Sequence, residues 1–124
     1  MPTREMTSTD HDGTVQEGIV LIDFWAAWCG PCRQFAPVYE RVSEANPDVV
    51  FTKVDTEAEP ELAQRYGITS IPTLVAYRDG IPVFGAPGAL PQQALEDVIR
   101  QVRELDMETV RARYAEQVAE HSPG

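Results

Sequence analysis

Three short apolar runs along the chain predict β-strands. They extend from Ile19 to Trp25, from Val49 to Asp55 and from Thr73 to Tyr77. Each is too short for a typical helix, and apolar residues follow one another without strict alternation, which is typical of strands covered on both faces. We therefore expect these strands to lie in a central sheet with helices on either side.

The two edges of this sheet carry different signals. Asp79-Gly80 and the following Ile81 to Phe84 predict a tight hairpin after the third run. Pro82 cannot donate a hydrogen bond to a ladder, so this last strand should lie at an edge. The first strand is the weakest prediction, because only Arg4 to Thr9 are available for it and Met6 is their one apolar residue.

Between the strands, apolar positions recur with helical spacing. They predict helices from about Pro31 to Ala45, from Pro60 to Tyr66 and from Pro91 to about Leu105. Pro37 lies inside the first of these helices, where it removes a backbone hydrogen bond and should cause a kink. Strands that alternate with helices and end in a hairpin and a helix predict an α/β fold with a mixed sheet.

Length, composition and charge narrow the class of protein. The chain has 124 residues, of which 43% are hydrophobic, so it is expected to form one globular domain. The net charge of −10 disfavours nucleic acid and anionic membrane surfaces as partners. The acids Glu57, Glu59 and Glu61 form a small cluster, which we interpret as a solvated surface. Met1 to Asp12 have no apolar stretch like that of a signal peptide, which predicts a cytosolic protein.

The only two cysteines lie in the pentapeptide from Trp28 to Cys32, directly after the first predicted strand. A Cys-x-x-Cys at the start of a helix is typical of disulfide exchange. Cys29 would lie over unpaired backbone amides at the positive end of the helix dipole, which favours its thiolate. Gly30 would keep the approach to the sulfur open, and Pro31 fits the first helical turn, where its missing N–H costs nothing.

A reaction sequence follows from this spacing. Cys29 would attack a target disulfide, and Cys32, one turn later on the same helix face, would resolve the mixed disulfide. Cys32 must then lose a proton, and Asp23 is the candidate acceptor, since a carboxyl group buried in an apolar strand has a raised pKa. Alternatively, Asp23 ends the strand and faces water, or caps a turn. The cysteine six residues downstream favours the buried acid.

Two other readings of the cysteines are disfavoured. A zinc site needs four ligands, and only His11 and His121, near the two termini, could complete it. Inert core thiols are the second alternative, but a Gly-Pro insert between two cysteines packs no core. We therefore predict no metal site.

The sequence resembles the thioredoxin family. The segment from Asp23 to Cys32 resembles the active-site segment of that family, and the likeness covers roughly Thr14 to Leu105. It continues, in order, through Lys53-Val54-Asp55, Tyr66 to Leu74, Asp79-Gly80 and Gly88-Ala89-Leu90. So many segments in one order are a far stronger signal than a lone Cys-x-x-Cys. The resemblance implies the thioredoxin fold, with a central mixed five-stranded sheet flanked by four helices.

The resemblance also implies roles for individual residues. Cys29 corresponds to the attacking cysteine, Cys32 to the resolving one, Asp23 to a buried aspartate behind the disulfide, and Lys53 to the lysine beside that aspartate. Pro72 corresponds to a proline whose preceding peptide bond is cis. The implied substrate-binding rim around Cys29 consists of Trp28, Gly30, Pro31, Ile71, Pro72 and Gly88, with the backbone of Ile71 pairing with the substrate chain.

Some positions depart from the family pattern. Pro87 stands before Gly88, where the family usually has a valine, so one backbone donor near the substrate groove is missing. Gly85-Ala86 occupies a stretch where a basic residue is common, and Ala27 replaces an acid between the two tryptophans. The first two changes leave the chemistry intact but bear on the range of target proteins.

The predicted domain spans residues 14–105, between a polar N-terminal segment (1–13) and a C-terminal extension (106–124). Val110, Tyr114 and Val118 recur every four residues in this extension. The stripe fits a short helix that is docked on the domain or on a partner, or is only partly formed. A solvated tail without function is favoured, because three apolar residues bury little surface.

We therefore expect a protein-disulfide reductase that carries electrons in the cytoplasm and contributes to cell redox homeostasis. The resemblance implies that a thioredoxin reductase regenerates the dithiol with electrons from NADPH, and that the chain itself binds no cofactor. We expect a monomer whose partners are this reductase and disulfide-containing proteins. The alternatives are a dedicated redox partner of one enzyme, or a binding or chaperone-like subunit in which the site is incidental.

Overall fold

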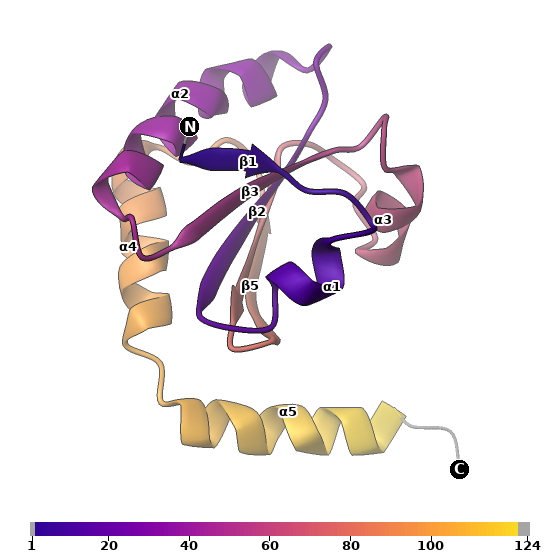
Figure 1. Cartoon of the computed structure of the whole chain (residues 1–124), viewed down its shortest axis with the longest axis vertical. Coiled ribbons are helices and arrows are strands. Elements are labelled where there is room, and N and C mark those ends of the chain that lie inside the picture. Colours follow the sequence, from indigo (N-terminus) through magenta and orange to yellow (C-terminus); the bar gives the residue numbers. More distant parts are fainter. Residues whose placement is uncertain (1, 122–124) are drawn as a thin grey trace.

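A five-stranded mixed sheet forms the centre of the computed structural model, which describes residues 2–121 (Figure 1). The strands are β1 (Thr3–Glu5), β2 (Ile19–Trp25), β3 (Val50–Asp55), β4 (Thr73–Arg78) and β5 (Ile81–Pro87). The helices are α1 (His11–Thr14), α2 (Gly30–Ala45), α3 (Pro60–Arg65), α4 (Gln92–Arg103) and α5 (Met107–His121). The predicted α/β class, the mixed sheet, the flanking helices and the helical extension are confirmed.

The strand order is β1-β3-β2-β4-β5. The strands β1, β3 and β2 run parallel, whereas β4 and β5 are antiparallel to their neighbours. Strand β2 is therefore the middle strand, paired with β3 on one side and β4 on the other. The strand that contains Pro82 lies at an edge, as its missing N–H predicts.

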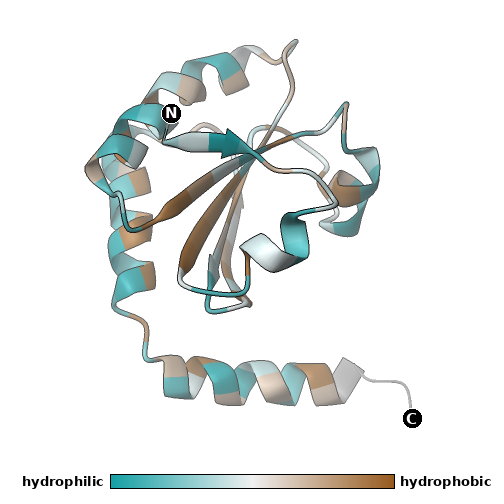
Figure 2. Ribbon diagram, viewed as in Figure 1, coloured by the Kyte–Doolittle hydropathy of each residue, from teal (hydrophilic) through white to brown (hydrophobic). Residues whose placement is uncertain are grey.

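Helices cover both faces of the sheet, with α2 and α4 on one face and α1 and α3 on the other (Figure 1). The central strands are the most hydrophobic part of the ribbon, and the helices mix hydrophilic and hydrophobic residues (Figure 2). Phe51 and Leu21 pack against Tyr39 and Leu95 on the first face. On the second face, Phe24 packs in a core with Leu62. The alternation along β2 thus divides the interior into two cores.

The hairpin between β4 and β5 closes with two residues of positive φ, Asp79 at 50° and Gly80 at 85°. Two such residues are typical of the tight turns that suit the twist of paired strands. Strand β5 continues to Pro87, beyond the predicted end at Phe84, because pairing with β4 continues to Thr73 after a register shift at Ala76/Tyr77.

The sequence did not predict helix α1, whose four residues are too few to show apolar periodicity. His11 is buried there, and both of its ring nitrogens contact polar groups. One ring nitrogen lies 2.6 Å from Asp12 Oδ1 and the other lies 2.5 Å from the Tyr66 hydroxyl, which contacts the Tyr77 hydroxyl at 2.6 Å. Strand β1 is short, as its weak signal suggested, and Met6 directly after it is buried.

Helix α5 projects from the end of α4 below the sheet (Figure 1). Met107 at its start is buried, whereas Tyr114 and Val118 are exposed. Residues 1 and 122–124 lie outside the described residues, so the predicted segment boundaries remain predictions there. The junction between the two helices is held by Arg78, whose guanidinium donates to the carbonyl oxygens of Val102 and Arg103 at 2.7 and 3.1 Å.

Replacing Arg78 with methionine should lower the free energy of unfolding by about 1–2 kcal/mol, because a charged donor to carbonyls at a helix end is lost. Urea unfolding should show a lower midpoint with an unchanged slope. Arg113→Met is the control, since Arg113 is exposed on α5 and should change stability by less than about 0.5 kcal/mol. Equal effects of the two variants would contradict the role given to Arg78.

Candidate active site at the start of helix α2

Cys29 is the N-cap residue of α2, at the point where the chain leaves β2 and enters the helix. Its backbone is extended, with φ −86° and ψ 114°, and its Sγ accepts a hydrogen bond from the backbone N–H of Cys32 at 3.2 Å. Pro31 lies in the first helical turn, as predicted. A sulfur at an N-cap is stabilised as the thiolate by this amide and by the helix dipole.

Cys29 and Cys32 are joined by a disulfide, with their Cα atoms 5.2 Å apart. Both are buried and cluster with Ala26, Trp25 and Ile71. The structure therefore represents the oxidised state of the pair. The chemical asymmetry of the two sulfurs is already visible, because Cys29 receives the amide hydrogen bond and Cys32 lies on the inner face of α2.

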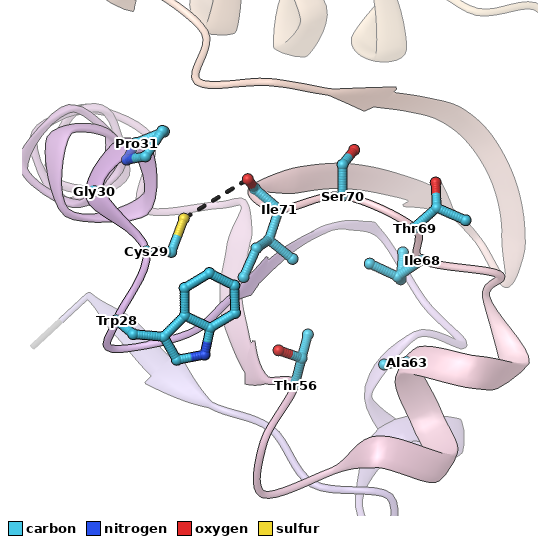
Figure 3. Close-up of a pocket in the computed structure, with 10 residues that line it drawn as sticks. All are labelled: Trp28, Cys29, Gly30, Pro31, Thr56, Ala63, Ile68, Thr69, Ser70 and Ile71. Atoms are coloured by element: carbon cyan, nitrogen blue, oxygen red, sulfur yellow. Dashed lines mark hydrogen bonds between the residues drawn. The ribbon is translucent and has the colours of Figure 1, made fainter.

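An open groove of about 400 Å³ lies beside the disulfide (Figure 3). Its walls come from the turn before α2, the loop after β3, helix α3 and the loop before β4. The lining residues are Trp28, Cys29, Gly30, Pro31, Thr56, Ala63, Ile68, Thr69, Ser70 and Ile71. The sulfur of Cys29 lies 3.6 Å from the carbonyl oxygen of Ile71, so backbone polar groups border the reactive atom.

Four of the six predicted rim residues line this groove, and the other two lie next to it. The peptide bond between Ile71 and Pro72 is cis, as the resemblance implied. Pro72 is buried, and its carbonyl oxygen accepts a hydrogen bond from the N–H of Gly88 at 2.8 Å. At Gly30, an added Cβ would meet only Arg33 at 4.0 Å, so packing within the chain does not require a glycine there.

One wall of the groove and the partner of Trp28 were not predicted from the sequence. The indole of Trp28 is 66% exposed, and its N–H donates to Glu57 Oε1 at 2.7 Å. Glu57 belongs to the acidic cluster that we interpreted only as a solvated surface. Thr56 and Ala63 do not themselves belong to a motif or a catalytic residue type, so the sequence carried no local signal for them.

Asp23 lies in the middle of β2, and only 1% of its surface is exposed. Burial raises its pKa from the ordinary value of 3.8 to about 7; Lys53 opposes this shift and Glu5 adds to it. Neither carboxyl oxygen has a hydrogen-bond partner among residues 2–121. Asp23 shares its sheet face with Leu21, which packs on α2, so it faces the helix that carries Cys32 on its inner side.

Lys53 is the residue paired with Asp23 in the parallel register between β2 and β3. Its ammonium group lies 4.7 Å from the centroid of the Trp25 ring, a cation–π contact. Asp23 and Lys53 are thus neighbours in the sheet, as the family resemblance implied.

Metal-ligating side chains do not cluster within the described part of the chain. No group of three or more His, Cys, Asp and Glu side chains there could hold a metal ion. His11 is engaged with Asp12 and Tyr66 on the far face of the sheet, and the side chain of His121 is outside the described set. In residues 2–121, no helix has the length and hydrophobicity needed to cross a bilayer.

A disulfide at the N-terminus of a helix, beside an open apolar groove and a cis-proline loop, defines a thiol–disulfide oxidoreductase of the thioredoxin fold. Residues 2–101 match the family model named Thioredoxin. The chain belongs to the thioredoxin family and acts on disulfide-containing partners.

Individual relatives agree with this assignment. The chain is 61% identical to a Streptomyces coelicolor protein named "Putative thioredoxin 2", over 95% of this chain and 89% of that one. It is 40% identical to a Staphylococcus aureus thioredoxin, over 77% of this chain and 92% of that one. Among solved structures, a mutant thioredoxin from Halobacterium salinarum is similar, with a TM-score of 0.77 and 36% identity over 83% of this chain and 92% of that one.

Replacing Asp23 with asparagine should stabilise the protein increasingly as pH rises. A carboxyl whose folded pKa is about 7 keeps its proton in the folded state at pH 4–7, whereas the unfolded chain releases it near 3.8. The stability that this proton confers is complete below pH 4 and is lost as pH rises to 7. The difference in free energy of unfolding, variant minus wild type, should therefore grow by about 2–4 kcal/mol from pH 4 to pH 8.

Urea titrations of the oxidised proteins at several pH values measure this difference. Glu17→Gln is the control, because Glu17 is exposed and its replacement removes no buried carboxyl. A flat pH profile for Asp23→Asn would contradict the buried, proton-retaining carboxyl.

Replacing Glu57 with alanine should raise KM for a disulfide peptide about two- to five-fold and leave kcat within a factor of two. The expected loss of substrate affinity is that of one exposed hydrogen bond, which orients the Trp28 indole at the wall of the groove. Glu61→Ala removes an equal charge from the exposed first turn of α3 and serves as the control. An identical KM change in both variants would assign the effect to charge and not to Trp28.

Proposed function

We propose that this chain is a general protein-disulfide reductase of the cytoplasm. The observation that carries the proposal is the position of Cys29, which caps α2 with its sulfur against an open groove. A protein chain can reach the sulfur there, while Cys32 stays on the covered side of the helix. This arrangement favours attack on large substrates, because the open groove leaves room for a folded partner.

The reaction proceeds in two exchanges. The Cys29 thiolate attacks one sulfur of the substrate disulfide, that S–S bond breaks, and the other substrate sulfur leaves as a thiolate. Cys32 then transfers its proton to the carboxylate of Asp23 and attacks the Cys29 sulfur of the mixed disulfide. The Cys29–Cys32 disulfide forms and the second substrate thiolate departs, so two electrons pass from the dithiol to the substrate.

The predicted rim residues around Cys29 bind the substrate in this scheme. Trp28 and Ile71 offer apolar surface on two sides of Cys29, and Gly30 and Pro31 leave its approach unobstructed. The carbonyl of Ile71 lies within 3.6 Å of the sulfur, which is close enough to position an extended substrate backbone beside it. Pro72 and Gly88 support this loop from behind through the bond between the Gly88 N–H and the Pro72 carbonyl.

The dithiol must be regenerated after each turnover. Relatives named thioredoxin support a thioredoxin reductase as electron donor, with NADPH consumed by that enzyme and no cofactor bound to this chain. The Gly-Pro pair between the cysteines supports the reducing direction. The chain works as a monomer in this scheme, because one copy carries both cysteines, the proton acceptor and the groove.

A dedicated redox partner of one enzyme is the second candidate. Pro87, exposed at the end of β5 next to Gly88, favours it, since a proline removes a backbone donor beside the substrate loop. Such a partner would use the same two exchanges on one target.

The deciding experiment is NADPH-driven reduction of insulin disulfides with a thioredoxin reductase supplied. Wild-type protein should support turnover, Cys29→Ser should abolish it, and Cys32→Ser should accumulate mixed disulfides with substrate. Activity with a chemical dithiol but not with the reductase would favour the dedicated partner. If Cys29→Ser kept the biological role of the wild type, the site would be incidental and the reductase proposal would fall.

A further inference from the structure

Three charged residues form one row across neighbouring strands. Glu5 on β1 pairs in register with Lys53 on β3, and Lys53 pairs with Asp23 on β2. Paired residues in adjacent strands point to the same face of the sheet, and strands lie about 4.8 Å apart, so Glu5 and Asp23 flank Lys53 at a backbone separation of about 10 Å. All three lie on the face covered by α2.

Lys53 does not neutralise either acid by direct contact. Among residues 2–121 it makes no ion pair within 4.0 Å, and its ammonium lies over the Trp25 ring. Its charge therefore acts on Asp23 and Glu5 at a distance, and the two carboxylates compete for one cation. Glu5 is exposed at the end of its short strand, whereas Asp23 is buried.

The other elements around Asp23 contribute little charge. Its partner on β4 is Leu74, an apolar residue. On α2, the Tyr39 hydroxyl donates to the Thr52 carbonyl at 2.8 Å, and burial holds the pKa of this phenol well above its ordinary value, so it is neutral. Glu40 accepts a hydrogen bond at 2.6 Å from Thr3, which lies on the same face of β1 as Glu5.

The remaining acid of this face is Asp55, which pairs in register with Trp25 and not with Asp23. The near charges on Asp23 are thus Lys53, which favours its ionised form, and Glu5, which disfavours it. Although Glu5 is exposed as a residue, partial burial of its carboxyl raises its pKa above the ordinary value, and Lys53 opposes this rise.

We propose that Glu5 is a positioning residue for the exchange reaction, acting on Asp23 directly and through Lys53. Its carboxylate opposes the negative charge of Asp23 and shares the attraction of Lys53, which keeps Asp23 protonatable near neutral pH. Asp23 can then receive the proton of Cys32 and release it again between turnovers. This inference rests on the proposed role of Asp23 as proton acceptor.

The first test follows the Asp23 carboxyl carbon by NMR across pH in the oxidised protein, which needs no activity. Glu5→Gln should lower the midpoint by about 0.3–0.6 pH unit, as expected for a charge about 10 Å away near the surface. Glu5→Asp should keep most of the wild-type midpoint. The difference between wild type and Glu5→Gln should shrink at 1 M salt, where the screening length is about 3 Å.

The control is Glu17→Gln, which removes an equal charge at the opposite end of β2 and should leave the midpoint unchanged. A midpoint that stays fixed in Glu5→Gln, or that moves equally in Glu17→Gln, would overturn the inference. A merely structural loss would not be rescued by Glu5→Asp and would not depend on salt.

The second test measures the resolving step. Reduced protein is mixed rapidly with an aromatic disulfide that releases a coloured thiol in each exchange, so the second release reports attack by Cys32. This rate should rise with pH as Asp23 ionises, and in Glu5→Gln the rise should shift to lower pH by the same interval as the NMR midpoint.

Asp23→Asn separates the two proposals. If it leaves the pH profile of the second release unchanged, the proton-acceptor role fails, and with it the positioning role of Glu5. The other outcome is that Asp23→Asn removes the rise of the second-release rate with pH. If Glu5→Gln then changes neither that rise nor the NMR midpoint of Asp23, only the inference about Glu5 fails.

Discussion

The burial of an acid in the middle strand constrains the whole site. Asp23 stands between β3 and β4, in register with Lys53 and Leu74, and no described donor reaches its oxygens. A carboxyl in that position keeps its proton to about pH 7 because water is excluded by the sheet and by α2. The same helix carries Cys32 on its inner face. The packing of α2 on the sheet therefore buries both Asp23 and Cys32.

The two cysteines differ because a helix end differs from a helix interior. Cys29 precedes the first turn, so its sulfur receives a backbone amide that has no intrahelical partner. Cys32 is inside the helix, where its own N–H makes that bond and its side chain turns towards the sheet. Two cysteines three residues apart thus differ in their surroundings, since Cys29 lines the groove and Cys32 does not, and Pro31 between them costs the helix no hydrogen bond.

Features of the fold and site that depend on neighbouring residues could be predicted from the sequence, whereas those that depend on contacts between distant segments could not. The apolar runs predicted the strands, and Pro82 predicted the edge, because these signals are local. The burial of His11 was not predicted, because it depends on a contact with the hydroxyl of Tyr66, 55 positions away. Glu57 was interpreted only as surface charge, because its contact with Trp28 joins two loops that meet only in the fold. The row from Glu5 to Asp23 depends on strand register, which composition and periodicity leave open.

The C-terminal helix is separated from this chemistry by the length of a strand. β4 begins at Thr73, next to the cis-proline loop, and ends at Arg78, roughly 17 Å away at 3.4 Å per residue. Helix α5 contacts that far end, where Arg111 pairs with Asp79 at 3.6 Å, and Leu105 in the connection before α5 accepts a hydrogen bond from Arg78 at 3.4 Å. The groove residues come from other segments. The Streptomyces relative matches 95% of this chain and so includes most of the extension, whereas the Staphylococcus relative matches 77%. The groove beside the disulfide thus contains no residue of α5, and the ion pair of this helix with Asp79 lies at the opposite end of the sheet.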